Sequence, residues 1–316
     1  MDMTISMLET GMRYEGFLLV RSADQREGKT GGKYLDMNLT DRTGEVNCKM
    51  WDGNIAPPAT GSVIKVRGLV QEYNGRKQLR VEKMRMATEA DGVDLSLLVP
   101  CAPEKPDAYR LQIEETIDRF ASEDLKKIVR EMLRLAGDNL EWFPAAQRLH
   151  HAERTGLLHH TCSMLNTAEH IIQAYPFLKG DLLRAGVILH DLSKITEMKS
   201  DTLGNVTDYT REGLLIGHLV MGVAKLAEAA SNVGVTGEIV VLLEHMIISH
   251  HGIPEYGSPK PPMFPEAEVL NWIDTLDARM NEMEGIMARV PAGAFSEKIW
   301  SLDRRMYHPF YEEGAE

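Results

Sequence analysis

The sequence has few cysteines and no long apolar run. Its three cysteines, Cys48, Cys101 and Cys162, lie far apart and form no CxxC pair. An odd number of scattered cysteines indicates neither a disulfide framework nor a cysteine zinc site. No uninterrupted apolar stretch approaches the ~20 residues of a membrane span, and the N-terminus lacks the basic and apolar segments of a signal peptide. The composition therefore predicts a cytoplasmic protein without a membrane partner.

Positive charge is also scarce, and it is unevenly distributed. The 316 residues include 35 Lys and Arg against 47 Asp and Glu, a net charge of −12, which argues against nucleic-acid binding over the whole surface. Residues 1–87 nevertheless hold 14 basic against 11 acidic residues, whereas the remainder holds 21 against 36. The more basic N-terminal region can attract a polyanion locally, although ordinary scatter in composition explains the difference equally well. The length leaves room for two domains.

The N-terminal region carries the signals of short strands. YLDMNLTD (34–41) alternates apolar and polar residues, and Asn74-Gly75 is a strong two-residue hairpin signal. A polar loop, REGKTGGK (26–33), follows the first strand. Five short strands joined by tight turns predict a small all-β Greek-key barrel of the OB type. From the pattern alone, an SH3-like barrel is the alternative.

A barrel of this type binds single-stranded nucleic acid with aromatic and cationic side chains on an open face. The aromatic candidates are Tyr34, Trp51 and Tyr73. The cationic candidates are Arg21, Lys29, Lys33, Lys49, Arg76, Lys77 and Arg80. A position in the rim or core explains Trp51 equally well, and a solvated surface charge is the simpler explanation of each single cation.

The pattern changes after a proline-containing segment without periodicity, residues 88–107. We interpret this segment as a linker between an OB-type domain, 1–87, and an all-α domain, 108–316. In the second region, apolar residues recur at helical spacing. Helices are expected at 157–174, 182–192, 212–230, 236–249 and 265–287.

The histidines are concentrated in the predicted helical domain. Ten of the eleven lie between His150 and His251, and His190-Asp191 stands at the end of an apolar helical run. The other groups, each on or at the end of a different predicted helix, are His159-His160, His218, His250-His251 and Asp274. Helices of a bundle can direct such side chains to one point. Imidazole and carboxylate ligands without thiolate predict an open metal site, not a closed structural zinc site.

The ordered series H…HD…H…HH…D, with HDLSK at its centre, resembles the HD-domain metal-dependent phosphohydrolases. The similarity is closer in RLHHAERTGLLHHTCSML (148–165) and HHGIPEYGSPKPPMFPEAEVLNWIDTLDARM (250–280). With an OB-like domain in front, these stretches resemble the YhaM-type 3′→5′ exoribonucleases of bacteria. The resemblance extends from about Arg13 to Met287 and is weakest in the barrel.

The resemblance implies roles for individual residues. The principal metal would be held by His160, His190, Asp191 and Asp274. A second ion would use His218 and His250, with His251 as the alternative to His250; whether one ion or two bind is left open. Asp191 would also orient the attacking water, and Lys194 would stabilise charge on the scissile phosphate. Lys260 would contact RNA, although a plain loop lysine is equally consistent.

The implied function is a metal-dependent 3′→5′ exonuclease that releases 5′-mononucleotides from single-stranded RNA, with DNA as a further substrate left open. Manganese is the favoured metal, and Fe, Ni, Mg and Zn also suit the ligands. One alternative is an HD-family nucleotidase or cyclic-nucleotide phosphodiesterase, although IPEYGSPK after HHG lacks the GYP triplet of cyclic-di-GMP hydrolases. Another is a single-strand-binding module with an inactive HD domain, against which the complete ligand set argues. A homo-oligomer is left open.

Overall fold

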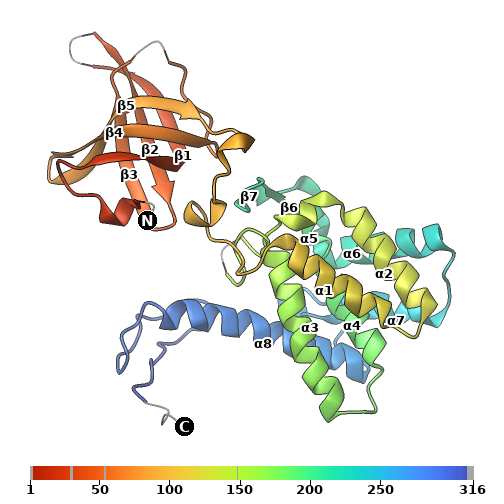
Figure 1. Cartoon of the computed structure of the whole chain (residues 1–316). Helices are drawn as coiled ribbons and strands as arrows, with labels where there is room; N and C mark the ends of the chain where they lie inside the picture. The colour runs from red at the N-terminus through yellow and green to blue at the C-terminus, as the bar shows by residue number, and fades with distance from the viewer. Residues whose placement is uncertain (1–2, 29–30, 53–54, 148, 312–316) are drawn as a thin grey trace. The chain divides into compact units, whose positions relative to one another are not determined.

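The chain folds into two compact units, Met1–Cys101 and Ala102–Glu316 (Figure 1). For comparison, the sequence predicts domains at 1–87 and 108–316 with a linker between them. Short 3-10 turns, η2 (Glu89–Asp91) and η3 (Leu95–Leu97), follow the last strand of the first unit. The residues described by the computed structural model are 3–28, 31–52, 55–147 and 149–311.

The first unit is a closed five-stranded barrel, which confirms the predicted OB type. Its strands are β1 (Arg13–Glu27), β2 (Lys33–Asp41), β3 (Gly44–Met50), β4 (Val63–Tyr73) and β5 (Arg76–Met86). They follow the order β1-β2-β3-β5-β4, and β4 pairs with β1 to close the barrel. The β3–β5 pairing is parallel and the others are antiparallel. Asn74 and Gly75 have φ of 51° and 73°, as a two-residue type I′ hairpin requires.

The barrel core follows from the two-residue period of its strands. In β2, the side chains of Leu35, Met37 and Leu39 are fully buried, whereas Tyr34 and Asp36 are only partly covered. A 3-10 turn, η1 (Ile5–Met7), packs against β3. The Ile5 amide donates a hydrogen bond of 2.6 Å to the Asp41 carboxylate, which fixes this turn to the end of β2.

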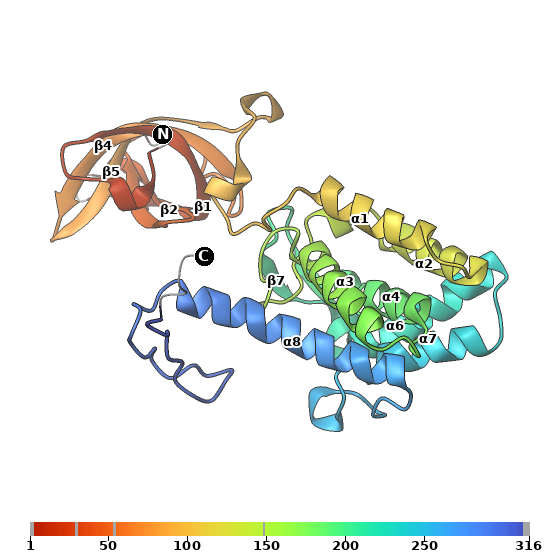
Figure 2. The same ribbon diagram turned by 60° about the horizontal axis from the view of Figure 1, so that its bottom comes forward.

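The second unit is a helical bundle around one large apolar core. Its helices are α1 (Pro106–Asp118), α2 (Glu123–Ala136), α3 (Gly156–Ala174), α4 (Gly180–Leu189), α5 (Lys194–Glu197), α6 (Arg211–Val233), α7 (Glu238–Ser249) and α8 (Pro265–Met287). Helix α3 packs against α1, α4 and α8 (Figure 2). A hairpin of β6 (Met198–Ser200) and β7 (Val206–Tyr209) was not predicted, because strands this short carry no readable alternation.

Helix α6 contains a break at Gly217, whose φ of 77° is not helical. The helix is also the only one in the described ranges that is long and apolar enough, by length and composition alone, to cross a bilayer. Core helices of soluble proteins pass the same test, so this is weak evidence for a membrane segment. The residue after the break, His218, is buried within the bundle.

Candidate metal centre and nucleic-acid face

The histidine and aspartate side chains predicted as metal ligands meet inside the helical unit. They come from five different helices, as expected from the spacing. His160 lies on α3, His190 and Asp191 follow the end of α4, His218 lies on α6, His250 follows the end of α7 and Asp274 lies on α8. The first five are buried, and the Asp274 side chain is 15% exposed.

One group of ligand atoms surrounds Oδ2 of Asp191. Nε2 of His190 lies 3.3 Å from this oxygen, and Nε2 of His160 lies 3.8 Å from it. Oδ1 of Asp274 is 3.2 Å from Nε2 of His160 and 4.0 Å from Nε2 of His190. Two imidazole nitrogens and two carboxylate oxygens therefore face a common point.

A second group lies on the other oxygen of the same carboxylate. Oδ1 of Asp191 is 3.5 Å from Nε2 of His218 and 3.6 Å from Nε2 of His250. His251 belongs to this group as well, because ligand atoms of His218, His250 and His251 lie within 4.8 Å of one another. The structure thus brings both histidines of the HH pair to the site, and Asp191 stands between the two groups.

Two carboxylates that were not predicted from the sequence orient two of the histidines. Oδ2 of Asp277 lies 2.7 Å from Nδ1 of His160, and Oε1 of Glu197 lies 3.0 Å from Nδ1 of His218. Ser163 donates a further hydrogen bond to Asp277. Each contact fixes Nδ1 as the protonated nitrogen and leaves Nε2 as the ligand atom. The position of Asp277, three residues after Asp274 on the same helical face, is a signal that could have identified it.

Two other histidines are oriented by the backbone of their own helices. Nδ1 of His190 donates to the carbonyl of Val187 at 2.8 Å, and Nδ1 of His250 donates to the carbonyl of Ile247 at 2.7 Å. Both histidines stand directly after a helix, where backbone carbonyls lack intrahelical partners. The helix ends therefore turn both Nε2 atoms toward the centre.

The residues present fit a divalent metal. Five buried polar atoms at the centre make no hydrogen bond to the described residues, and buried polar groups are normally paired. They are Nε2 of His160, His190, His218 and His250, and Oδ1 of Asp191. All five are atom types that ligate metals, and carboxylates beside them supply negative charge.

Burial and neighbouring charges shift the pKa values of the side chains at the centre. Burial alone would raise the pKa of Asp191, but Lys194 and His190 hold it well below its usual value. Burial lowers the pKa of His250 to about 3, which keeps that imidazole neutral. For His160, the nearby carboxylates of Asp274 and Asp277 outweigh burial and raise the pKa to about 9. A divalent ion would replace the proton that these carboxylates hold on His160.

Lys194 and His150 also face the centre. Nζ of Lys194 lies 2.7 Å from Oδ2 of Asp191 and its side chain is 11% exposed, so it is not a solvated surface lysine. The His150 ring lies 5.4 Å from that of His160, and burial, with Lys194 and His160 nearby, lowers its pKa to about 3. The sequence pattern predicts no role for His150, because this residue lies outside any predicted helix.

Aromatic and cationic side chains gather on one side of the barrel, as the sequence predicted for a nucleic-acid face. The rings of Tyr34 and Trp51 lie 4.7 Å apart, and Nζ of Lys49 lies 5.3 Å from the Tyr34 ring and 5.5 Å from the Tyr73 ring. Trp51 and Tyr73 are 62% and 60% exposed, so Trp51 is not a core residue. These four side chains are called the aromatic face below.

The remaining predicted contacts differ in their surroundings. Arg76 and Lys77 line a hollow of about 970 Å³ beside Lys49 and Tyr73, although Lys77 donates its own hydrogen bond to the Leu8 carbonyl. Three others are placed as follows: Lys33 is exposed at the start of β2, Arg21 pairs with Glu45 at 3.5 Å, and Arg80 lines a second hollow with Trp51. Lys260 is exposed in the loop between α7 and α8, and Lys29 lies outside the described residues.

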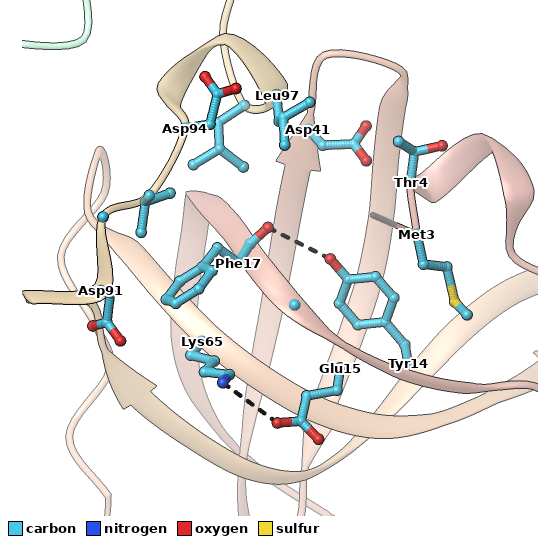
Figure 3. A pocket seen from close by; sticks show the side chains of 14 residues that line it. Met3, Thr4, Tyr14, Glu15, Phe17, Asp41, Lys65, Asp91, Asp94 and Leu97 are labelled. Atoms are coloured by element: carbon cyan, nitrogen blue, oxygen red, sulfur yellow. Dashed lines mark hydrogen bonds and ion pairs between the residues drawn. The ribbon is translucent and has the colours of Figure 1, made fainter. Parts of the chain in front are cut away.

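Another pocket of the first unit, of about 540 Å³, does not suit a polyanion (Figure 3). Its wall carries the carboxylates of Asp41, Asp91 and Asp94, and Lys65 there pairs with Glu15 at 3.5 Å. A phosphate backbone would meet like charge along this wall.

The sequence of this chain matches two family models. Residues 19–87 match a family described as an OB-fold nucleic acid binding domain, and residues 157–279 match the HD domain. The first match covers most of the barrel, and the second contains all the candidate metal ligands: His160, His190, Asp191, His218, His250, His251 and Asp274.

Several curated bacterial proteins are similar to the chain over nearly its whole length, and each is named 3′-5′ exoribonuclease YhaM. The protein of Geobacillus sp. (strain WCH70) is 37% identical over 305 residues, which cover 95% of this chain and 93% of that protein. The protein of Listeria monocytogenes serotype 4b (strain F2365) is 37% identical, covering 99% of this chain and 100% of the relative. The protein of Bacillus licheniformis is 36% identical, covering 96% and 97%.

Proposed function

This chain belongs to the YhaM family of 3′-5′ exoribonucleases, and we propose that it removes mononucleotides one at a time from the 3′ end of single-stranded RNA. The observation that carries the proposal is the convergence of four histidine Nε2 atoms and an Asp191 oxygen that lack hydrogen-bond partners among the described residues. Buried lone pairs without hydrogen-bond partners are costly, and a bound divalent metal would pair these five atoms.

Two metal ions are proposed, with Asp191 between them. His160, His190 and Asp274 would hold the first ion, and His218, His250 and His251 would hold the second. Manganese is the proposed metal, since mixed imidazole and carboxylate ligands with open positions suit it. Bound ions would acidify the attacking water and neutralise charge on the phosphate.

The side chains of the protein complete the chemistry. The Lys194 ammonium, which burial would make less basic, keeps a raised pKa because Asp191 lies beside it, so it remains charged. It would stabilise negative charge on a phosphate that reaches Asp191. His150 remains neutral and its ring lies 5.4 Å from that of His160, so its N–H could donate a hydrogen bond to a phosphate oxygen bound at the centre.

The aromatic face of the barrel would hold the single strand. Tyr34, Trp51 and Tyr73 offer stacking surfaces and Lys49 offers charge, a combination that is tolerant of sequence. Arg76, Lys33 and Lys260 would contribute phosphate contacts. We further propose that residues 88–107 act as the linker, and that the enzyme is cytoplasmic.

The test is a gel assay with 5′-labelled single-stranded RNA and Mn²⁺. We expect a ladder that shortens from the 3′ end, 5′-mononucleotides as products, and no cleavage with a chelator. Asp191→Asn should lower the rate at least ~100-fold, because it removes the carboxylate shared by both ligand groups. His170→Asn, at an exposed histidine on α3, is the matched control and should retain full activity.

The assay also separates the rival functions. A shifted but uncleaved RNA band would support a binding module with an inactive HD domain. Hydrolysis of mononucleotides or cyclic nucleotides without RNA shortening would support the small-molecule enzymes. The same ladder with labelled DNA would extend the substrate to both nucleic acids. RNA cleavage at the wild-type rate by chelated protein and by Asp191→Asn would contradict the metal mechanism.

A further inference from the structure

A separate cluster of three ligand-type side chains lies beside the metal centre, at the start of α3. Nδ1 of His151 lies 3.1 Å from Nδ1 of His159. Oε1 of Glu153 lies 2.8 Å from Nδ1 of His159 and 3.7 Å from Nδ1 of His151. The two imidazole rings stand nearly perpendicular, with an interplanar angle of 85°. Around a tetrahedral zinc ion with bonds of 2.0–2.2 Å, neighbouring ligand atoms lie about 3.3–3.6 Å apart. The three distances in the cluster, from 2.8 to 3.7 Å, bracket this spacing.

The hydrogen-bonding of the cluster leaves lone pairs facing one another. Nε2 of His151 lies 2.8 Å from Oδ2 of Asp277, and a carboxylate only accepts, so Nε2 carries the hydrogen and Nδ1 the lone pair. That lone pair faces the other imidazole nitrogen and the Glu153 carboxylate. Nδ1 of His159 can supply one hydrogen to the cluster, and Nδ2 of Asn281, 3.4 Å from Nδ1 of His151, can supply another. A divalent cation would satisfy all three at once.

The backbone of the cluster is held in an unusual conformation. His151 has φ of 47°, which is uncommon for a residue with a side chain. Its amide donates to Asn281 of α8 at 2.9 Å, and its carbonyl accepts from Ala145 at 3.1 Å. Strained residues persist where surrounding contacts over-determine them, and they cluster at ligand sites. These contacts direct the His151 ring toward His159.

The cluster is accessible from one side. The His151 side chain is 2% exposed, whereas those of Glu153 and His159 are 19% and 22% exposed. The ring of Tyr109 stacks on His159 at 5.7 Å and restricts its orientation. An ion can therefore reach the three ligands from solvent, and a fourth position is left for water, as in zinc sites with three protein ligands.

We propose that His151, Glu153 and His159 form an additional binding site for a zinc-type divalent cation, distinct from the HD centre. Oδ2 of Asp277 accepts from both Nε2 of His151 and Nδ1 of His160, at 2.8 and 2.7 Å. The two metal sites thus share one carboxylate, so occupancy of one alters the affinity of the other, and the coupling is reciprocal. Cation binding at this cluster does not depend on the proposed nuclease function.

The test compares zinc stoichiometry in the full-length chain. After chelation and removal of the chelator, wild-type protein should bind one more equivalent of Zn²⁺ than either Glu153→Gln or His159→Gln. His170→Gln, at an exposed histidine of the same helix, should match the wild type. Co²⁺ offers a spectroscopic readout, since a four-coordinate site should add intense visible absorption that both variants lose.

Diffraction at the zinc edge from wild-type crystals soaked in Zn²⁺ avoids any folding defect of the variants. An anomalous peak among His151, Glu153 and His159 is expected, separate from peaks around Asp191. Equal stoichiometry in the wild type and both variants would overturn the proposal. So would the absence of an anomalous peak at the cluster in crystals whose HD centre is loaded.

Discussion

At the scale of single residues, Asp277 supports the metal centre from behind His160. It accepts hydrogen bonds from His160, His151 and Ser163. Burial would raise its pKa, but the bonds from the two histidines hold it well below the usual value, so the carboxylate stays charged. Its charge would make His160 a stronger metal ligand by polarising the imidazole N–H.

Asp277→Asn should therefore weaken metal binding without removing a ligand. We expect the Mn²⁺ concentration for half-maximal activity to rise ~10–100-fold, the usual effect of losing a partner of a ligating histidine, with the rate recovering at saturating metal. Metal titration of initial rates on single-stranded RNA is the measurement. Glu284→Gln, at an exposed position of the same helix, is the control. An unchanged activation curve for Asp277→Asn would show that His160 needs no such support.

The three cysteines should differ in reactivity. Cys48 and Cys162 are buried, and burial raises the pKa of Cys162 to about 12 and that of Cys48 as well. Because the thiolate is the reactive form, only the partly exposed Cys101 should react quickly with a disulfide reagent in native protein. One rapid thiol before unfolding and three afterwards is the expected count. Any rapid thiol in the native Cys101→Ser variant would contradict the burial of the other cysteines.

At the scale of helices and strands, the break in α6 is a property of Gly217. Its φ of 77° and ψ of 157° lie in a region that essentially only glycine adopts and cost a residue with a side chain about 1–3 kcal/mol, while a Cβ there would meet only Glu197 Oε1, at 3.9 Å. Gly217→Ala should thus lower the free energy of unfolding by about that amount and shift His218, which follows directly. The matched change is Gly285→Ala in α8, where φ is ordinary and space is open, and it should stabilise by ~0.5–1 kcal/mol. Denaturant titration of both variants checks the difference, and equal effects would be inconsistent with backbone strain at Gly217.

The aromatic face of the barrel makes an independent prediction about binding. Trp51→Ala removes one stacking surface, and such a loss costs ~1–3 kcal/mol, or about 5- to 150-fold in affinity. The measurement is fluorescence anisotropy of labelled RNA with chelated protein, so that cleavage does not interfere. Trp300→Ala removes an 87% exposed tryptophan of the other unit and serves as the control. Equal affinities of the two variants would place RNA binding elsewhere.

The elements differ in how far the sequence could predict them. Helix α8 was predicted from Pro265 to Met287 and has those bounds, because a proline begins it and its apolar spacing is regular. The candidate ligands could be selected because histidines at the ends of apolar helices are chemically conspicuous, and their binding of metal stays a prediction. Glu197 was missed because its link to His218 is made only by the approach of α5 to α6. The His151 cluster was also missed, since an irregular loop with a positive φ has no periodicity to reveal it.

At the scale of the whole molecule, the barrel and the helical bundle have separate apolar cores. Only the bundle holds the histidine–aspartate centre. A metal ion that binds only the folded bundle, at a free concentration of 100 times its dissociation constant, stabilises the bundle by ~2.7 kcal/mol. This raises the melting temperature of a unit of this size by roughly 5–10 °C. Calorimetry should show two transitions, of which chelation lowers only one. The fragment 1–101 should reproduce the metal-independent transition; a single transition that responds to metal as a whole would contradict independent cores.

The order of the two units along the chain also matters during protein synthesis. The last strand of the barrel ends at Met86, whereas the final ligand of the HD centre, Asp274, lies far downstream. At ~5–20 residues per second, a ribosome needs roughly 10–40 s to cover the interval. For that time a nascent chain can carry a completed barrel while its metal centre lacks a ligand. The proposed nuclease would therefore acquire the means to hold RNA before the means to cut it.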